Sequence, residues 1–195
     1  MSSRENDKRI DSEMGDDRKS SNFVKNGKVY ILGDFDCTIS RYVIPDFVDL
    51  VGACSGQRDA IIPMYINSFG GDAHELFGLL SAMDLARIVG VRIYTYNIGV
   101  AYSCGSLLAV SGDQRFMSKN ARNLMHLGES SRIASTYEQL KRTNKDTMDF
   151  FDKIVGIYKE RTKMTEAKIR KILEDDLYFM GAKECLRLGL VDSLF

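Results

Sequence analysis

Residues 97–110 read NIGVAYSCGSLLAV, a run of small residues that leads from an extended segment into an apolar helix. The pattern predicts a tight turn at Ser103, which would place its hydroxyl at the N-terminus of that helix. Free N–H groups and the positive end of the helix dipole favour developing negative charge there. Such a turn suits a serine nucleophile, although a simple connection between strand and helix gives the same pattern.

Apolar strands alternate with amphipathic helices on both sides of this turn. We expect strands at 29–32, 61–66 and 91–96, each followed by a helix. The helices are expected at 37–51, with a start nearer 44 because of Pro45, at 73–89, and directly after Ser103. The alternation predicts an α/β fold with a largely parallel, layered sheet. Ligands in such folds bind beyond the carboxyl ends of the strands, where the glycine-rich turns fall.

The second half of the chain continues with short strands at 114–117 and 123–127 and a long helix at 136–161. A shorter helix at 165–173, a turn at 174–180, a helix at 181–188 and a final strand formed by 190–191 and 194–195 complete the pattern. Residues 1–26 are polar and charged, which predicts a flexible N-terminal arm. We therefore expect an arm at 1–26 and one domain at 27–195.

Composition excludes several classes of protein. The 27 basic and 27 acidic residues among 195 cancel, so the charge of a nucleic-acid binder is missing. No apolar run approaches the roughly 20 residues that span a bilayer, and the start of the chain has no secretory signal. The four cysteines lie far apart and the histidines are only two, which favours a cytoplasmic protein without disulfides, metal or cofactor.

A serine hydroxyl needs a positioned base to become a nucleophile. His126, at the end of a predicted strand, is the better candidate, since His74 lies in the first turn of a helix between acidic neighbours. Cys104 could act instead, but a small buried cysteine is the simpler interpretation. Gly70–Gly71 could let a backbone N–H approach a substrate carbonyl as an oxyanion hole, or could be an ordinary turn.

Together these segments resemble the proteolytic subunit of the Clp protease, the ClpP family. The resemblance covers residues 29–194, and four segments carry it in order and at similar spacing. They are YINSFGG at 65–71, GVAYSCGS at 99–106, NARNLMH at 120–126, and YFMGAKE at 178–184 with GLVD at 189–192.

The resemblance implies a serine endopeptidase that cleaves unfolded protein chains to short peptides. Ser103 would attack the scissile carbonyl, His126 would serve as general base and then acid, and the N–H groups of Gly71 and Cys104 would hold the oxyanion. The orienting acid departs from the family, because an ungapped match places Leu177 there. With one inserted residue the acid becomes Asp176. Asp175, or a triad without an acid, is the alternative.

Two further departures lie beside the expected site. Phe69 stands where the family usually has proline, and Leu127-Gly128 replace the usual glutamine and proline after the histidine. Substrate preference, and activity itself, could differ from those of the family.

The resemblance also implies an assembly. The fold would be a ClpP/crotonase-like layered fold of repeated ββα units with a protruding handle helix, and protomers would form two stacked seven-membered rings. An ATP-dependent Clp unfoldase would feed chains into them, although the N-terminal arm lacks the family's apolar start. A divergent phage-type member could work without an unfoldase. The alternatives are a catalytically silent ring subunit and a crotonase-type acyl-CoA enzyme.

Overall fold

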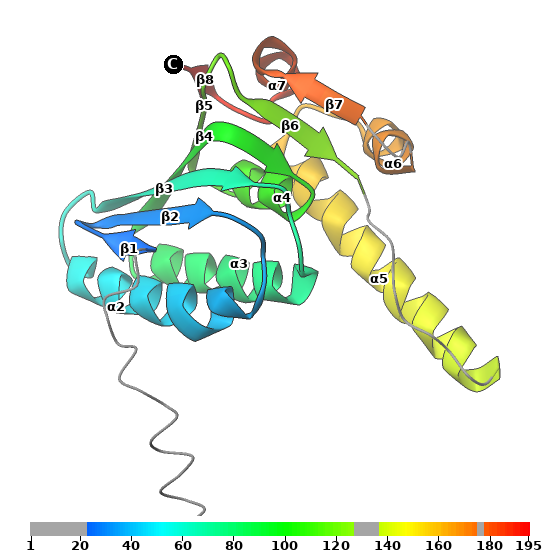
Figure 1. Ribbon diagram of the computed structural model, residues 1–195, viewed down its shortest axis with the longest axis horizontal. Helices are drawn as coiled ribbons and strands as arrows, with labels where there is room; N and C mark the ends of the chain where they lie inside the picture. Colours follow the sequence, from blue (N-terminus) through cyan, green and yellow to red (C-terminus); the bar gives the residue numbers. More distant parts are fainter. Residues whose placement is uncertain (1–22, 127–136, 175–177) are drawn as a thin grey trace, which may run out of the picture.

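A twisted, mostly parallel sheet organises the computed structural model, which describes residues 23–126, 137–174 and 178–195. Neighbouring strands of the main sheet follow the order β1-β2-β3-β4-β5-β8, and every pair is parallel except β1 with β2 (Figure 1). The strands are β1 (Val24–Lys25), β2 (Lys28–Leu32), β3 (Ile61–Ser68), β4 (Arg92–Tyr102), β5 (Gln114–Met117) and β8 (Ser193–Leu194).

The sheet branches at β4, its longest strand. The first half of β4 pairs with β5, and the second half pairs in parallel with β6 (Arg122–Met125). β6 in turn pairs antiparallel with β7 (Tyr178–Gly181). The branch brings β6 and β7 beside the end of β4, directly before Ser103.

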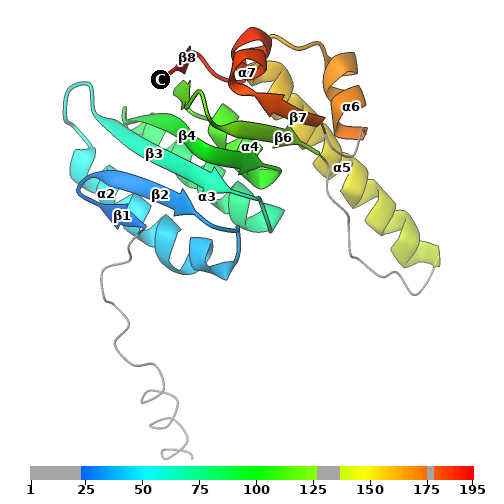
Figure 2. The same cartoon turned by 45° about the horizontal axis from the view of Figure 1, so that its top comes forward.

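Helices cover one face of this sheet, as Figure 2 shows. Every second side chain of the strands points toward these helices and is buried beneath them, as at Ile31, Met64 and Ile93. This alternation is expected for a sheet that is covered on one side. The covering helices are α2 (Ile44–Cys54), α3 (Ala73–Ile88) and α4 (Cys104–Val110). A short π-helix, η1 (Ile39–Val43), precedes α2.

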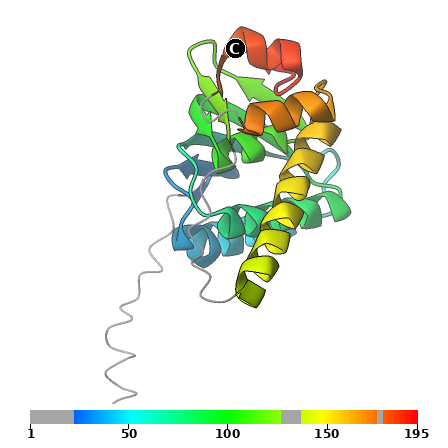
Figure 3. The same ribbon diagram turned by 90° about the vertical axis from the view of Figure 1, so that its right-hand side faces the viewer.

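A long helix, α5 (Tyr137–Arg161), projects beyond the body of the molecule (Figures 1 and 3). Its C-terminal turns bury Phe151, Ile154, Val155 and Tyr158 in the core, which anchors the helix while its N-terminal part extends outward. Two further helices, α6 (Glu166–Glu174) and α7 (Ala182–Leu188), follow it. The predicted layered α/β fold with a handle helix is confirmed.

Several predicted ends of strands and turns are wrong, because pairing between strands extends or creates strands there. The strand expected at 91–96 continues to Tyr102, because its small residues pair with β3 and β6. The turn expected at 174–180 ends in β7, which pairs with β6. Within the predicted arm, Val24–Lys25 form β1 against β2. The helix expected at 37–51 is confirmed, because helical backbone begins at Cys37 and runs through η1 into α2. The later start near 44 holds only for the regular α-helix α2, which has Pro45 in its first turn.

Candidate active site

Ser103 joins β4 to α4 in a strained conformation. Its φ and ψ of 54° and −120° are rare for a residue with a Cβ and cost on the order of 1–3 kcal/mol. Three backbone hydrogen bonds hold it there. Its N–H donates to the Leu124 carbonyl (2.9 Å), and its carbonyl accepts from the N–H groups of Ser106 (2.9 Å) and Leu107 (3.2 Å). The side chain makes no capping bond to α4, so the hydroxyl stands half-buried at the positive end of the helix.

The Gly70–Gly71 turn lies against Ser103. Both glycines have positive φ, 110° and 133°, and a Cβ at Gly70 would lie 2.7 Å from the Cβ of Ser103. A Cβ at Gly71 would lie 2.4 Å from the Phe35 carbonyl oxygen, because Phe35 bonds to the backbone on both sides of Gly71. Only glycine fits these two positions, because an added Cβ would clash at either one.

Cys104 is buried beside this turn, and its thiol is a poor nucleophile. Burial raises the pKa of the thiol to about 11, so it stays protonated at neutral pH. Its Sγ donates to the Gly71 carbonyl (3.2 Å), which holds the first turn of α4 against the glycine turn. In the part of the chain that the structure describes, the backbone N–H groups of Gly71 and Cys104 donate to no backbone carbonyl. Both groups face the Cys104 sulfur, where their hydrogen bonds oppose the rise in the pKa of the thiol.

His126 directly follows β6 at the same edge of the sheet. Tyr102 and Leu124 are register partners in β4 and β6, so Ser103 and His126 lie one and two residues beyond a paired position. Neighbouring strands are about 4.8 Å apart, so both residues lie at the same edge of the sheet. Among the described residues, no hydrogen bond joins the Ser103 hydroxyl to the His126 ring, so its role as general base stays a prediction. His74 is exposed in α3, and its backbone N–H is capped by Asp72.

The predicted acid, Asp176, lies outside the described residues, as do Asp175 and Leu177. The described chain resumes at Tyr178, which is the register partner of Met125. The chain thus enters β7 beside the end of β6 that carries His126.

An aromatic cluster borders the site, and of its members the sequence singles out only Phe69 as a neighbour of the site. Phe69 precedes the glycine turn and packs edge-to-face on Tyr102 (ring centroids 5.6 Å apart), which packs in the same way on Phe179 (5.5 Å). Phe69 is 68% exposed and Phe179 is 48% exposed. No local signal marks Phe179, because only the pairing of β7 with β6 brings it to Tyr102.

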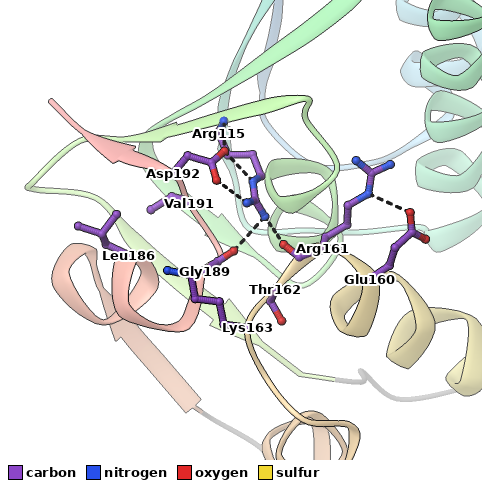
Figure 4. Close-up of a pocket in the computed structure, with 9 residues that line it drawn as sticks. All are labelled: Arg115, Glu160, Arg161, Thr162, Lys163, Leu186, Gly189, Val191 and Asp192. Carbon is purple, nitrogen blue, oxygen red and sulfur yellow. Dashed lines mark hydrogen bonds and ion pairs between the residues drawn. The ribbon is translucent and has the colours of Figure 1, made fainter.

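Two hollows of the surface lie apart from these residues. The one in Figure 4, of about 270 Å³, is lined by Arg115 of β5 and by residues at and beyond the ends of α5 and α7, including Lys163 and Asp192. The other, of about 390 Å³, lies between α3 and α5. Neither contains a predicted catalytic residue. The candidate site lies instead at the edge of the sheet where β4 and β6 end.

The described residues contain no group of three or more His, Cys, Asp and Glu side chains that could hold a metal ion. Over the same residues, no helix is both long and apolar enough to cross a membrane.

Comparison with known proteins identifies the family. The family model described as Clp protease matches residues 12–195, a range that begins inside the predicted arm. A proteolytic subunit of the ATP-dependent Clp protease from Deinococcus radiodurans is 33% identical over 135 residues, which are 68% of this chain and 64% of the relative. The subunit from Streptococcus mutans is 29% identical over 89% of this chain and 87% of its own length. Subunit 2 from Bacillus licheniformis is 28% identical over 89% and 88%.

These relatives confirm the predicted resemblance and, with it, the class of a serine peptidase. They favour that class over a silent ring subunit and over an acyl-CoA enzyme. The chain belongs to the Clp protease family.

Proposed function

We propose that this chain is a serine endopeptidase that cleaves unfolded polypeptides, with Ser103 as its nucleophile. The observation that carries the proposal is the strained Ser103 between β4 and α4, against a glycine turn that tolerates no side chain. His126 at the end of the adjacent strand supports it. A nucleophile on a sharp turn between strand and helix is exposed to substrate and close to free N–H groups.

The proposed reaction proceeds by acyl transfer. The Ser103 Oγ attacks the scissile carbonyl carbon while His126 takes the hydroxyl proton. The N–H groups of Gly71 and Cys104 donate to the oxygen, which carries the negative charge of the tetrahedral intermediate. His126 then gives its proton to the leaving amine, and the C–N bond breaks. Water, deprotonated by His126, releases the acyl group and restores Ser103.

Asp176 is proposed to orient His126 and to stabilise the imidazolium that forms in the first step. The entry of the chain into β7 beside Met125 supports an acid from this segment. Asp175 is the alternative, and a triad without an acid would retain weaker catalysis.

Proteins of the Clp protease family assemble into oligomeric rings together with Clp ATPases. For this chain we propose two stacked seven-membered rings and an ATP-dependent unfoldase as partner. Two features support an assembly. The helix α5 projects from the body, and the side of the sheet without helices carries the stacked rings of Tyr30, Tyr65, Tyr96 and Phe116. Apolar surface of this kind is usually covered by a partner.

We also propose a cytoplasmic location. All four cysteines, Cys37, Cys54, Cys104 and Cys185, are free thiols, as is usual in a reducing compartment.

The decisive experiment is labelling with a fluorophosphonate probe, which reacts with activated serines. The wild-type chain is expected to be labelled at Ser103 and to hydrolyse short fluorogenic peptides. Ser103→Ala should abolish labelling and lower hydrolysis by several orders of magnitude, with an unchanged melting temperature. The control is Ser81→Ala. The Ser81 hydroxyl is exposed on α3 and donates to the Phe77 carbonyl of the same helix, so this variant should behave as wild type. Undiminished turnover of Ser103→Ala would contradict the proposal.

The same assay tests the acid. Asp176→Asn should slow both labelling and hydrolysis, because a misoriented imidazole is a poor base. A change no larger than that of a distant surface variant would rule out Asp176.

A further inference from the structure

A chain of buried hydroxyl and amide groups runs through the core behind the candidate site. The Tyr158 hydroxyl donates to the Ser106 Oγ (2.9 Å), and the Ser106 hydroxyl donates to the Asn123 Oδ1 (2.9 Å). All three residues are buried, with 1%, 0% and 3% of their surface exposed. They come from three elements, α5, α4 and β6, which are far apart in sequence.

These groups are costly to bury, so their bonds must form. A buried hydroxyl or amide without a hydrogen-bond partner lowers the free energy of unfolding by on the order of 1–3 kcal/mol. Burial also raises the pKa of Tyr158 well above its ordinary value, so its hydroxyl stays neutral and can donate. Ser106 has one hydroxyl proton. Because Tyr158 donates into the Ser106 oxygen, that proton remains free for the amide oxygen of Asn123.

The hydrogen-bond chain ends on the two segments that carry the proposed catalytic residues. Ser106 lies one turn beyond Ser103, and its N–H bonds to the Ser103 carbonyl. Asn123 lies three residues before His126 and opposite Ala101 in β4. The Ser103 turn is thus joined to β6 twice, through its own N–H to Leu124 and through the Ser106 side chain to Asn123.

We propose that Tyr158 is a positioning residue for peptide hydrolysis, because it holds Ser106 in the rotamer that bonds the Ser103 turn to the strand of His126. The inference rests on the proposed function. Without the Tyr158 hydroxyl, the Ser106 hydroxyl can rotate to a carbonyl of the preceding turn, as serines in helices often do. The side-chain bond between α4 and β6 is then lost, and the relative placement of nucleophile and base loosens.

A merely structural role for Tyr158 would affect stability alone, so the test separates stability from chemistry. Tyr158→Phe removes one hydroxyl without changing the packing volume. Thr95→Val is the matched control, because the Thr95 hydroxyl is also buried and donates to the Ala109 carbonyl (2.7 Å) at the opposite end of α4. Both variants lose one buried hydrogen bond between neighbouring elements, but only one of these bonds lies near Ser103.

The measurements are the rate of fluorophosphonate labelling and the separate kcat and KM values for a short peptide, all on the full chain. Tyr158→Phe is expected to lower the labelling rate and kcat roughly 5- to 20-fold, since small displacements of reacting groups are costly. KM should change less than about twofold, because the hydroxyl is remote from the substrate surface. Thr95→Val should label at nearly the wild-type rate at temperatures where it is folded.

Ser106→Ala provides a second variant and a test of coupling. If Tyr158 acts through Ser106, the double variant Tyr158→Phe/Ser106→Ala will be no slower than Ser106→Ala alone. Wild-type labelling rates in Tyr158→Phe, equal losses in Thr95→Val, or additive losses in the double variant would each overturn the inference. Failure of the wild-type chain to label would instead overturn the proposed function, so the two failures are distinguishable.

Discussion

At the scale of single residues, the candidate site depends on backbone conformations that few residues adopt. Ser103 holds a positive φ of 54° although it has a Cβ, and Gly70 offers the space into which that Cβ projects. The two positions are therefore matched to each other. The strain at Ser103 persists because hydrogen bonds on both sides of it hold the turn.

Replacing Gly70 by alanine tests this match. The added Cβ would lie 2.7 Å from the Ser103 Cβ at a φ of 110°, so either the turn or Ser103 must move. We expect Gly70→Ala to lower kcat by about 100-fold, the order expected for a displacement near 1 Å. The measurement is steady-state peptide hydrolysis together with thermal unfolding.

Gly90→Ala is the control for Gly70→Ala. Gly90 also has a positive φ, of 81°, but it has open space around its Cβ position. That variant should lose some stability and keep its activity when folded. If Gly70→Ala keeps more than half of the wild-type kcat, the match between the two positions is not needed for catalysis.

At the scale of elements, Arg115 of β5 joins the C-terminal ends of two helices to the sheet. Its guanidinium donates to the Asp192 carboxylate (2.5 and 3.0 Å), to the Gly189 carbonyl (2.9 Å) and to the Arg161 carbonyl at the end of α5 (Figure 4). The Arg115 side chain is only 14% exposed. One cation thus satisfies a free carbonyl at the end of α5 and another at the end of α7.

The partner carboxylate makes this arrangement dependent on pH. Partial burial alone would raise the pKa of Asp192, but the hydrogen bonds and charge of Arg115 outweigh it and lower the pKa. Asp192→Asn should lower the free energy of unfolding by about 1–3 kcal/mol at pH 7, because the partly buried Arg115 guanidinium loses its counter-charge. A carboxylate with a lowered pKa stabilises the fold above its unfolded pKa, about 3.9. The difference between variant and wild type should therefore shrink as the pH falls below about 4.

Denaturant unfolding at several pH values measures this difference. Asp84→Asn is the control, because Asp84 also pairs with an arginine, Arg87, but is 70% exposed. An exposed pair adds little to stability. A constant difference between Asp192→Asn and wild type from pH 7 to pH 3 would contradict the assignment.

At the scale of the whole molecule, two surfaces are unusual for an isolated protomer. The side of the sheet without helices carries a row of stacked aromatic rings, and α5, whose C-terminal turns are anchored in the core, projects from the body (Figure 3). Met148, on this helix, is 56% exposed. Both surfaces can be covered by neighbouring protomers of a ring assembly.

Light scattering should accordingly give a mass near that of fourteen protomers. Met148→Glu should shift the distribution toward smaller assemblies if α5 joins the two rings, because it places a charge on an apolar contact. The control is Lys153→Gln, an exposed change on the same helix. A monodisperse monomer of the wild-type chain would contradict the assembly.

Much of the fold and of the candidate site follows from local patterns. Strands and helices up to the Ser103 turn were predictable, because the spacing of apolar residues along the chain differs between strands and helices. Ser103, Gly70 and Gly71 were recognisable because their chemistry and conformational needs are local. The edge of the sheet was harder to predict. The last part of β4 is rich in small residues, which resemble a loop, and β7 is stabilised by a partner more than fifty residues away.

The sequence by itself therefore determined the α/β class, the tight turn at Ser103, the glycine turn and the histidine at a strand end. Each of these depends on the spacing of apolar residues, or on the size or chemistry of residues that are neighbours in the sequence. Only the tertiary structure decided that Phe179 packs on Tyr102 and that Tyr158 reaches Ser106. Those contacts arise from the pairing and packing of elements distant in the chain, and no local pattern encodes which buried hydroxyl finds which partner.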